Sequence, residues 1–483
     1  MNQRMVFNTV GKILLAEAAL MLLPTLVSLI YQESCFSAFL LTIAIAAALG
    51  VLLMLISRPK DTVIYAKEGF VIVALAWIAA SLIGALPFTI SGEIPSYIDA
   101  IFETVSGFTT TGASILTDIE SMSHGLLFWR SFTHWVGGMG VLVFVMALIP
   151  SLSERSIHIL RAEAPGHNVG KLVPRMKDTA KILYLIYIGM TLAEIVCLLC
   201  GGMSLFESVV HTLGTAGTGG FGVKADSIAG YSPYLQWVIA IFMLLFGVNF
   251  NLYYLLLIRR FKSVFRSGEL WAYIGIALAS VLLISIDIWP KYQNFTEVLR
   301  LSTFQVSSIL TTTGYVTADF NLWPDLSKTV LLLLMIVGGC AGSTAGGMKV
   351  SRVVIMLKRI GSEWQRMLHP RSVKTLKFEG KKLENTTVTG VCNYILVYFI
   401  CLATILVLLS TDPTAFGFET NVSAALACFN NVGPGLAGVG PVENYAAYSD
   451  FSKLILSGAM LLGRLEIFPL LIFFSPSTWT KKG

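Results

Sequence analysis

Long apolar runs alternate with short polar segments along the whole chain. A helix of roughly 20 apolar residues is long enough to cross the hydrocarbon core of a bilayer. Ten candidate runs can be marked, at residues 10–30, 36–56, 70–90, 126–150, 182–199, 234–258, 270–289, 324–358, 391–409 and 454–474. The first two form a hairpin joined by a short polar turn, and the other eight form four successive pairs.

Each of those four pairs encloses a shorter segment that begins amphipathic and ends in a polar loop with glycine. The segments read FETVSGFTTTGAS at 102–114, FESVVHTLGTAGTGGFG at 206–222, FQVSSILTTTGY at 304–315 and VSAALACFNNVGPG at 422–435. Irregular backbone at membrane depth is tolerated only where it is buried in protein or lines a water-filled cavity. We therefore expect each segment to enter the membrane and return, and the four loops to meet around one axis.

The pattern predicts an all-α polytopic membrane protein. It would contain four parallel helix–pore loop–helix repeats around one pore plus an N-terminal two-helix hairpin, which makes ten spans and four re-entrant pore helices. The predicted units are a transmembrane hairpin at residues 1–60 and pore repeats at 61–150, 151–265, 266–370 and 371–483.

The composition agrees with a membrane protein. Of the 483 residues, 55% are hydrophobic and 13% are charged, and the mean hydropathy is +0.75. Soluble proteins are usually about one quarter charged. The net charge of +6 does not indicate nucleic-acid binding, because the basic residues lie in short connections between apolar runs. Cys197 and Cys200 have redox-motif spacing but lie inside an apolar run, where packing is the better interpretation.

The basic residues also predict the orientation. Lys and Arg collect in the segments 58–68, 151–181, 259–269 and 358–388, whereas the connections on the opposite side carry mostly Asp and Glu. The positive-inside rule places the basic segments and both termini in the cytoplasm, with all four glycine loops facing outward. Every repeat then runs in the same direction, unlike the inverted repeats of many secondary transporters.

The glycine loops suit a cation that must lose its water. Rings of backbone carbonyl oxygens replace the hydration shell in ion filters, and glycine adopts the backbone angles needed to aim successive carbonyls at an axis. The preceding short helices would direct their negative C-terminal ends to the same place. The candidate cation ligands are Thr110, Thr111, Gly112, Thr218, Gly219, Gly220, Thr312, Thr313, Gly314, Asn431, Val432 and Gly433.

The third repeat has a second unusual segment, GGCAGSTAGG at 338–347. Each glycine inside a helix costs about 1 kcal/mol relative to alanine, so the run at 324–358 should break there. A broken segment below the filter could block the path or move aside. It fails the phosphate-loop motif, because Lys349 follows Met348 rather than a glycine. The candidate gate residues are Gly338, Gly339, Gly342, Ser343, Thr344, Gly346, Gly347, Lys349 and Arg464.

Arg464 belongs to that set because it lies inside the last apolar run. An ionisable residue within a span is by default a functional-site hypothesis. Two interpretations stay open: an electrostatic latch near the pore, or a buried pair with a carboxylate. Glu466 is a poor partner on the same helix, because residues two apart do not face one another.

These motifs resemble those of the Trk/Ktr/HKT superfamily, and most closely its TrkH-type potassium uptake proteins. The similarity covers the whole chain, and its specific matches are TTTGA at 109–113, GGF at 219–221, TTTGY at 311–315, NNVGPG at 430–435, the segment 338–349 and GRLE at 463–466. The resemblance implies that the four glycines line a potassium filter and that 338–347 is an intramembrane gating loop near Arg464. It also implies a bacterial cytoplasmic (inner) membrane location, a homodimer, and a cytosolic TrkA-like ring that senses nucleotides.

The resulting prediction is potassium uptake through a carbonyl-lined filter, driven by the membrane potential and gated by the intramembrane loop under control of that ring. The alternative is a proton- or sodium-coupled symporter that uses Glu17 or Glu194 as its coupling site. An enzyme is not expected, because neither a His-Glu-x-x-His nor a Gly-x-Ser-x-Gly motif occurs. Potassium would be transported cargo, and no bound cofactor is expected in this chain.

Overall fold

The structure is a computed structural model that describes residues 1–59, 65–140, 176–371, 375–413 and 416–479. The predicted basic connection at 151–181 lies mostly outside the described residues, as does the end of the apolar run at 126–150. In the described part, helices account for nearly all regular structure. The exception is a small antiparallel hairpin of β1 (Lys377–Phe378) and β2 (Lys381–Lys382).

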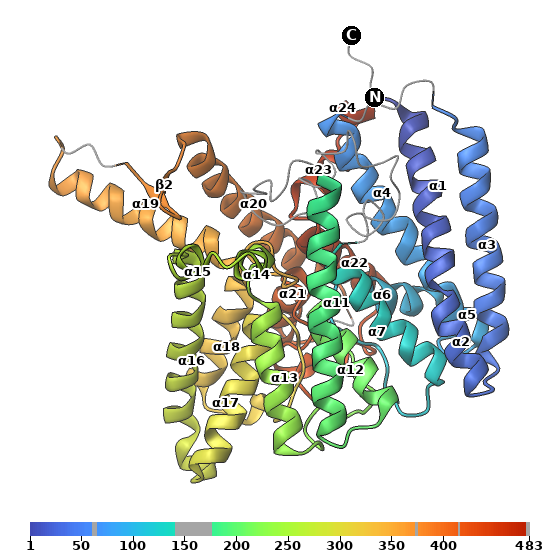
Figure 1. Ribbon diagram of the computed structural model, residues 1–483, viewed down its shortest axis with the longest axis horizontal. Coiled ribbons are helices and arrows are strands. Elements are labelled where there is room, and N and C mark those ends of the chain that lie inside the picture. Colours follow the sequence, from blue (N-terminus) through green and yellow to red (C-terminus); the bar gives the residue numbers. More distant parts are fainter. Residues whose placement is uncertain (60–64, 141–175, 372–374, 414–415, 480–483) are drawn as a thin grey trace.

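The N-terminal hairpin is present as predicted. α1 (Gln3–Leu20) and α2 (Leu22–Ile30) form one arm and α3 (Cys35–Ile56) forms the other, and they stand together at one side of the molecule (Figure 1). The two arms cross closely at Gly11 and Gly50: a methyl group added at Gly50 would lie 2.8 Å from the Gly11 carbonyl oxygen. Small residues at such a crossing let two membrane helices approach and gain van der Waals contact.

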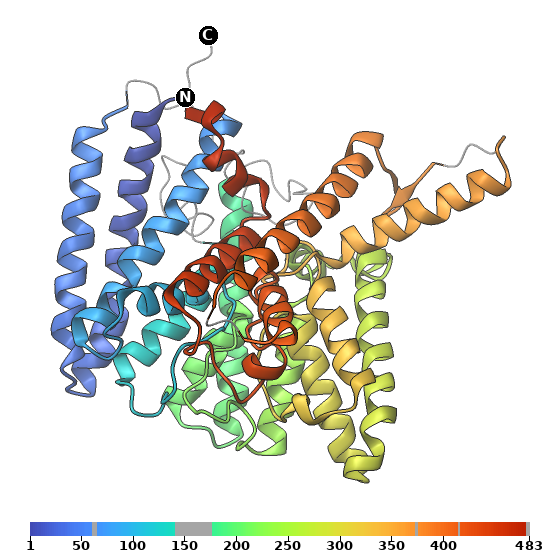
Figure 2. The same ribbon diagram turned by 180° about the vertical axis from the view of Figure 1, so that it is seen from behind.

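The four predicted repeats follow, each with a short helix between two longer elements. We keep the name pore helices for the four short ones, which are α6 (Tyr97–Phe108), α12 (Leu205–Gly217), α17 (Phe295–Leu310) and α21 (Phe418–Phe429). The first elements of the repeats are α4 (Ala66–Gly84) with α5 (Leu86–Ser91), α11 (Met176–Cys200), α16 (Gly268–Tyr292) and α20 (Asn385–Ser410). The second elements begin with α7 (His124–Gly138), α13 (Pro233–Phe246), α18 (Asp325–Val337) and α22 (Asp450–Arg464). Figure 2 shows the fourth repeat packed across the middle of the molecule.

The second elements are broken more often than the sequence suggested. The break at the third repeat was predicted: α18 ends at Val337, and α19 (Val350–Leu368) begins after the glycine-rich segment. In the second repeat, α13 and α14 (Phe250–Leu257) meet at 91°, where a continuous run at 234–258 was expected. In the fourth repeat, α22 and α23 (Phe468–Phe474) are separate, although a single span at 454–474 was expected.

Local bonding accounts for both of these breaks. The Asn249 side chain accepts a hydrogen bond from the Asn251 N–H and so caps α14, which starts a new helix after Gly247. At the second break, Ile467 has φ 67° and ψ −59°, and the Phe468 N–H donates to the Glu466 carbonyl at 2.7 Å. This is a γ-turn of the rare, strained hand, and no glycine marks it in the sequence.

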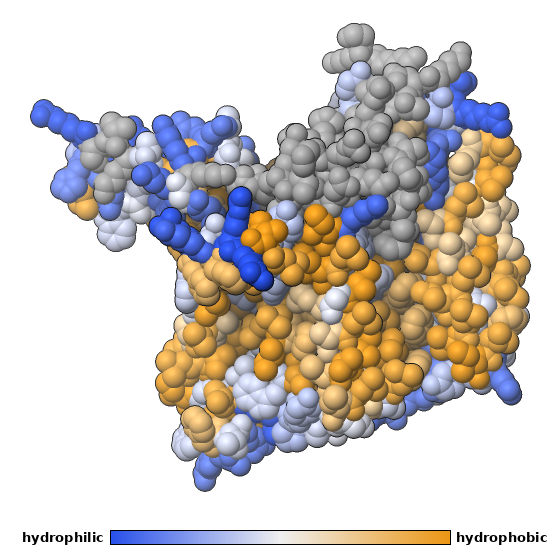
Figure 3. Space-filling view, viewed as in Figure 1, coloured by the Kyte–Doolittle hydropathy of each residue, from blue (hydrophilic) through white to orange (hydrophobic). Residues whose placement is uncertain are grey.

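The surface has the apolar belt of a membrane protein. Figure 3 shows a broad hydrophobic band between two hydrophilic ends. On α16, Leu278, Leu282 and Ile286 are each more than 60% exposed. Six described helices are long and apolar enough to cross a membrane, and the bent pair of α13 and α14 is a seventh candidate. An apolar surface of this extent indicates lipid contact.

The close crossing of α1 and α3 gives a stability prediction. Gly50→Ala should lower the thermal stability of the detergent-solubilised protein, because the new methyl group meets the Gly11 carbonyl oxygen and the Leu15 side chain; overpacking of this kind costs about 1–3 kcal/mol. Gly189→Ala is the matched control: it lies in α11 with nothing within 4 Å of the new methyl group. It should be neutral or stabilising, because alanine favours helix. Equal melting-temperature changes for both variants would contradict the close contact between α1 and α3 at Gly50.

Candidate functional site

The four pore helices end in the same way. After α6, Thr110 takes a left-handed conformation with φ 55°, its N–H donates to the Gly107 carbonyl, and the next N–H donates to the Ser106 carbonyl. This bond pair is the Schellman motif. The same two bonds close α12, α17 and α21, with the left-handed residues Thr218, Thr312 and Asn431 at φ 56°, 55° and 57°.

The residue types at these left-handed positions are unusual. Helices that end in this motif normally have glycine there, and a non-glycine residue in this region costs about 1–3 kcal/mol unless the surroundings impose it. Three of the four positions hold a β-branched threonine, and all four side chains are fully buried. Strain repeated at four equivalent places suggests a functional requirement. These residues were predicted as cation ligands, but their left-handed backbone conformation was not predicted from the sequence.

The glycines that follow two residues later close a ring. Gly112, Gly220, Gly314 and Gly433 have φ between 78° and 97°, which only glycine adopts without strain. A methyl group added at Gly112 would lie 2.0 Å from the Gly219 carbonyl oxygen of the next repeat. The corresponding distances are 2.1 Å from Gly220 to the Thr313 oxygen, 2.2 Å from Gly314 to the Val432 oxygen and 2.6 Å from Gly433 to the Thr111 oxygen.

These contacts run from the first repeat to the second, third and fourth and back to the first. The structure therefore brings all twelve predicted ligand residues together in four turns, at 110–112, 218–220, 312–314 and 431–433, which we call the glycine turns. Each glycine packs against the carbonyl of the residue that precedes the glycine of the next repeat. No side chain larger than hydrogen fits at these four positions without moving backbone.

The threonine hydroxyls tie the turns to their neighbours. The Thr111 hydroxyl lies 2.8 Å from the Thr109 hydroxyl and accepts a hydrogen bond from the Asn431 amide. Thr311 and Thr313 form the same 2.8 Å pair in the third repeat. Among the described residues, the buried Thr110 hydroxyl has no hydrogen-bond partner. The role of Thr110 as a cation ligand stays a prediction.

The charges on the pore helices favour a cation at the ring. Each has a carboxylate in its first turn, namely Asp99, Glu207, Glu297 or Glu419, and none of these four helices has a basic residue in its last turn. Acidic residues stabilise the positive N-terminal end of the helix dipole, and the negative end at the turns stays uncompensated. No group of three or more His, Cys, Asp or Glu in the described ranges could hold a metal ion. The candidate cation ligands are the carbonyl oxygens of the glycine turns, where the negative ends of the four helix dipoles meet.

The glycine-rich segment packs directly against this ring. We call residues 338–349 the inner loop. The Gly346 N–H donates to the Thr312 hydroxyl at 2.6 Å, and the Gly347 N–H donates to the Asn430 carbonyl at 3.1 Å. On its other side, the Cys340 N–H donates to the Gly247 carbonyl at 2.9 Å, at the bend between α13 and α14.

Arg464 joins the inner loop to the first repeat. Its guanidinium donates to the Thr344 carbonyl at 2.9 Å and to the carbonyls of Gly137 and Gly138 at 2.5 and 2.8 Å. Lys349 is buried, with its ammonium donating to the Ala345 carbonyl inside the loop. The predicted gate residues are thus brought together, and Arg464 bridges two repeats through backbone carbonyls.

The ion-pair partner of Glu466 lies on a separate helix. Glu466 forms an ion pair with Arg352 of α19, with 2.5 Å between the charged atoms, and the Arg352 guanidinium lies 4.0 Å from the centre of the Tyr394 ring. Sequence analysis missed Arg352, because 114 residues separate it from Glu466. The basic, amphipathic pattern of α19 gave no signal for this contact.

Sequence analysis also missed residues that hold the turns from behind. The Tyr445 hydroxyl donates to the Gly433 carbonyl at 2.8 Å. His134 lies between the first two repeats: its Nε2 accepts from the Phe221 N–H at 3.3 Å, so its Nδ1 carries the proton that it donates to the Gly107 carbonyl at 2.8 Å. His134 inside an apolar run was an available signal, whereas Tyr445 lies in the connection before α22 and gave none.

The whole chain is similar to known cation transport proteins. The model of the TrkH family, described as a cation transport protein, matches residues 36–481. The chain is 36% identical to the Trk system potassium uptake protein TrkH of Salmonella typhimurium strain LT2, over 99% of this chain and 100% of that protein. It is 33% identical to TrkH of Halomonas elongata, over the full length of both.

A solved structure shares the fold. The crystal structure of the potassium transporter TrkH from Vibrio parahaemolyticus superposes with a TM-score of 0.88 at 31% identity, and covers 99% of this chain and 100% of that one. The predicted fold class and the resemblance to the superfamily are confirmed. The matched proteins are transporters and not enzymes, as expected for this chain. The chain therefore belongs to the TrkH family of cation transport proteins.

Proposed function

We propose that this protein carries potassium into the cell through the ring of glycine turns. The observation that supports this most strongly is the closed cycle of contacts from Gly112 to Gly219, Gly220 to Thr313, Gly314 to Val432 and Gly433 to Thr111. The carbonyl oxygens of this ring would replace the water around a dehydrated ion. Its relatives in Salmonella typhimurium and Halomonas elongata are named potassium uptake proteins.

The membrane potential would supply the energy. Each 100 mV is worth about 2.3 kcal/mol per elementary charge, which sustains roughly fifty-fold accumulation at about 1.4 kcal/mol per tenfold. The N-terminus and the last described helix, α24 (Pro476–Trp479), lie at the same end of the molecule as α15 (Phe261–Phe265), α19 and the β-hairpin (Figure 1). Arg259, Arg260, Lys262 and Arg266 are exposed there. By the positive-inside rule this end faces the cytoplasm of a bacterial inner membrane.

Partners would dock at the same end. Helix α19 extends away from the body of the molecule (Figure 1) and exposes Trp364, Met367 and Leu368, each at 65% or more. This surface supports the family expectation of a homodimer and a cytosolic nucleotide-sensing TrkA-like ring. Mass measurement of the detergent-solubilised protein tests the homodimer, and a monomer alone at micromolar concentration would contradict it.

A coupled symporter is the second candidate. It is favoured by Glu194, which is wholly buried in α11, a helix that packs against pore helix α12. Glu17 is also buried, with its carboxylate against α4: its Oε1 would lie 3.2 Å from a methyl group added at Gly84. Buried carboxylates within a membrane can bind and release protons. Uptake that stops when the proton gradient alone is removed, at fixed potential, would favour this alternative.

The ring predicts a specific effect of adding one methyl group. In proteoliposomes under a clamped potential, potassium flux should exceed sodium flux when each ion is supplied alone. Gly314→Ala should reduce potassium flux more than about tenfold, a change of about 1.4 kcal/mol or more in the barrier, because the methyl group meets the Val432 oxygen. Gly112→Ser should reduce the preference for potassium for the same reason.

Gly92→Ala is the control for backbone strain. Gly92 has φ 82°, like the ring glycines, but nothing lies within 4 Å of an added methyl group. Its flux should stay near that of the wild type. Equal losses in Gly92→Ala and Gly314→Ala would assign the effect to strain, and unchanged flux in Gly314→Ala would overturn the proposed path.

The inner loop is proposed to act as the gate. It would lie below the ring in the ion path, held closed by the bonds of Gly346 to Thr312 and of Arg464 to Thr344. The candidate gate residues would act together: the glycines allow the loop to refold, and Arg464 latches it while its charge repels cations.

Removing the gate should open the path. Deletion of residues 342–346 should raise potassium flux, and Arg464→Gln should raise it by a smaller factor, as measured in the same proteoliposomes. Arg359→Gln is the matched control, because Arg359 lies 45% exposed on α19 and pairs with Glu363. A folded deletion protein with unchanged or lower flux would argue against a gate.

A further inference from the structure

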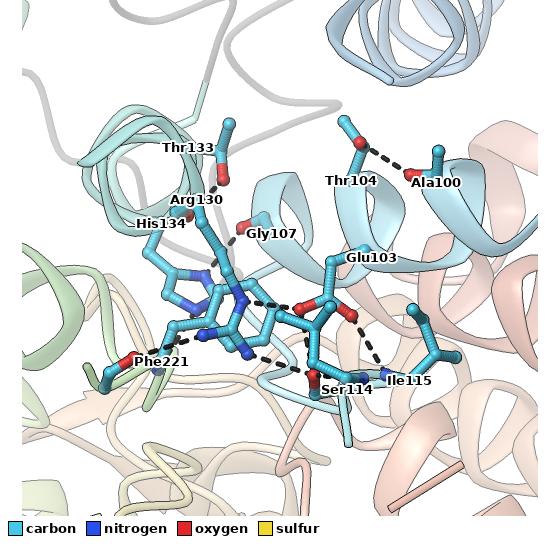
Figure 4. Close-up of polar contacts among 12 residues, drawn as sticks. Ala100, Glu103, Thr104, Gly107, Ser114, Ile115, Arg130, Thr133, His134 and Phe221 are labelled. Atoms are coloured by element: carbon cyan, nitrogen blue, oxygen red, sulfur yellow. Dashed lines mark hydrogen bonds and ion pairs between the residues drawn. The ribbon is translucent and has the colours of Figure 1, made fainter. Parts of the chain in front are cut away.

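A buried ion pair lies directly behind the first two glycine turns. Arg130 of α7 and Glu103 of α6 are 3% and 0% exposed, and 2.5 Å separates Arg130 Nε from Glu103 Oε1. Figure 4 shows the Arg130 guanidinium between Glu103, Ser114 and Phe221. Burying two charges is costly unless their remaining hydrogen-bonding atoms are also satisfied, so the partners of this pair indicate its role.

Those partners come from two different turns. Glu103 accepts hydrogen bonds from the Ser114 hydroxyl and the Ile115 N–H, both at 3.0 Å. Arg130 donates to the same hydroxyl at 3.1 Å and to the Gly222 carbonyl at 3.1 Å. Ser114 stands two residues after Gly112, and Gly222 stands two residues after Gly220. The ion pair therefore joins equivalent positions of the first and second turns.

A second contact fixes the same junction. The Arg130 guanidinium lies 3.6 Å from the centre of the Phe221 ring. The Phe221 N–H donates to His134 Nε2, and His134 donates to Gly107 at the end of α6. Arg130 and His134 are one helical turn apart on α7 and so lie on the same face of it. This single helix therefore holds the first and second glycine turns together through two separate side chains.

The other junctions at the level of the turns are closed by hydrogen bonds between neutral groups in the described part of the chain. Between the second and third repeats, the Tyr315 hydroxyl donates to the carbonyls of His211 and Phe221 at 3.0 and 3.1 Å. Between the third and fourth, Asn321 exchanges two hydrogen bonds with Ala437 at 3.1 and 3.0 Å. Between the fourth and first, the Tyr445 N–H donates to the Ser114 carbonyl at 2.9 Å. Among the described residues, the junction of the first and second turns differs because a fully buried ion pair lies at the level of the turns. The Lys453–Asp99 pair also joins the fourth and first repeats, but it lies at the start of α6.

We propose that the Glu103–Arg130 pair is a positioning element that determines ion selectivity, by fixing the separation of the first and second glycine turns. This inference rests on the proposed function of the ring. Discrimination between potassium and sodium depends on the number, spacing and freedom of the coordinating carbonyls. The planar, charged guanidinium donates in fixed directions to three groups, on Glu103, Ser114 and Gly222, so it restrains the two turns more tightly than a neutral hydrogen bond does. Neither side chain contacts the ion; both act through the backbone of the turns.

The test compares potassium and sodium flux in variants that remove both charges together. In Glu103→Gln/Arg130→Met, no unpaired charge stays buried, but the bond to the Gly222 carbonyl is lost. The ratio of potassium to sodium flux should fall about tenfold, equivalent to about 1.4 kcal/mol, while potassium flux persists. An unchanged ratio of potassium to sodium flux in the folded double variant overturns the proposal. An equal loss of both fluxes also overturns it, because a purely structural role of the pair predicts that result.

Two further variants keep the test decisive. Ser114→Ala removes only the hydroxyl shared by Glu103 and Arg130, and it should lower the ratio severalfold; an unchanged ratio overturns the proposal even where the double variant fails to fold. Arg130→Lys keeps the charge but loses the planar guanidinium with its several N–H donors, and it should lower the flux ratio toward that of the double variant. A wild-type ratio in Arg130→Lys would contradict the geometric role.

Glu33→Gln is the matched control. The Glu33 carboxylate also holds α7, through hydrogen bonds from the N–H groups of His124 and Gly125 at 2.6 and 2.9 Å, but those residues lie at the start of the helix, away from the turns. Its flux ratio should match that of the wild type. If the wild type itself shows no preference for potassium, the proposed function fails. If the wild type is selective and the Glu103, Arg130 and Ser114 variants are equally selective, this inference alone fails.

Discussion

The structure depends on one conflict in hydrogen bonding. An ion that sheds its water inside a membrane needs carbonyl oxygens that the protein has left available, yet an unsatisfied backbone group at that depth costs several kcal/mol. The glycine turns resolve the conflict by dividing the backbone into two sets. The N–H groups of each turn bond back to the preceding pore helix in Schellman pairs, and the carbonyls of Thr111, Gly219, Thr313 and Val432 line up from repeat to repeat. The four pore helices are buried toward their C-terminal ends because those ends must meet.

The four repeats share one architecture, but the residues at their equivalent positions differ. Threonine occupies the left-handed position in three turns and asparagine in the fourth, and the Asn431 amide bonds across to Thr111. The inner loop comes from the third repeat alone, while Arg464, which donates to its Thr344 carbonyl, comes from the fourth repeat and reaches Gly138 of the first. A single chain with four unequal repeats can build the ring and the loop packed against it from different elements. A symmetric tetramer would carry each feature four times.

Much of this plan could be predicted from the sequence, because it follows from local signals. A glycine two positions after a threonine or asparagine marked the turns, and apolar length marked the spans on each side of them. The break after Val337 was visible as a cluster of glycines, whereas the break at Ile467 was not, because a strained β-branched residue gives no composition signal. Asn249 was visible, but the apolar run around it suggested a continuous helix rather than a cap. The pairs of Glu103 with Arg130 and Glu466 with Arg352 join residues distant in the chain, which periodicity and spacing do not report.

The most direct test of the central claim is the position of a heavy monovalent cation in crystals of the purified protein. Thallium(I) resembles potassium in size and charge and scatters anomalously. The account predicts an anomalous peak inside the ring, within bonding distance of carbonyl oxygens of the four glycine turns, and loss of that peak when sodium replaces thallium. Peaks found only at the rim of the molecule, or beside the buried carboxylates Glu17 and Glu194, would contradict it.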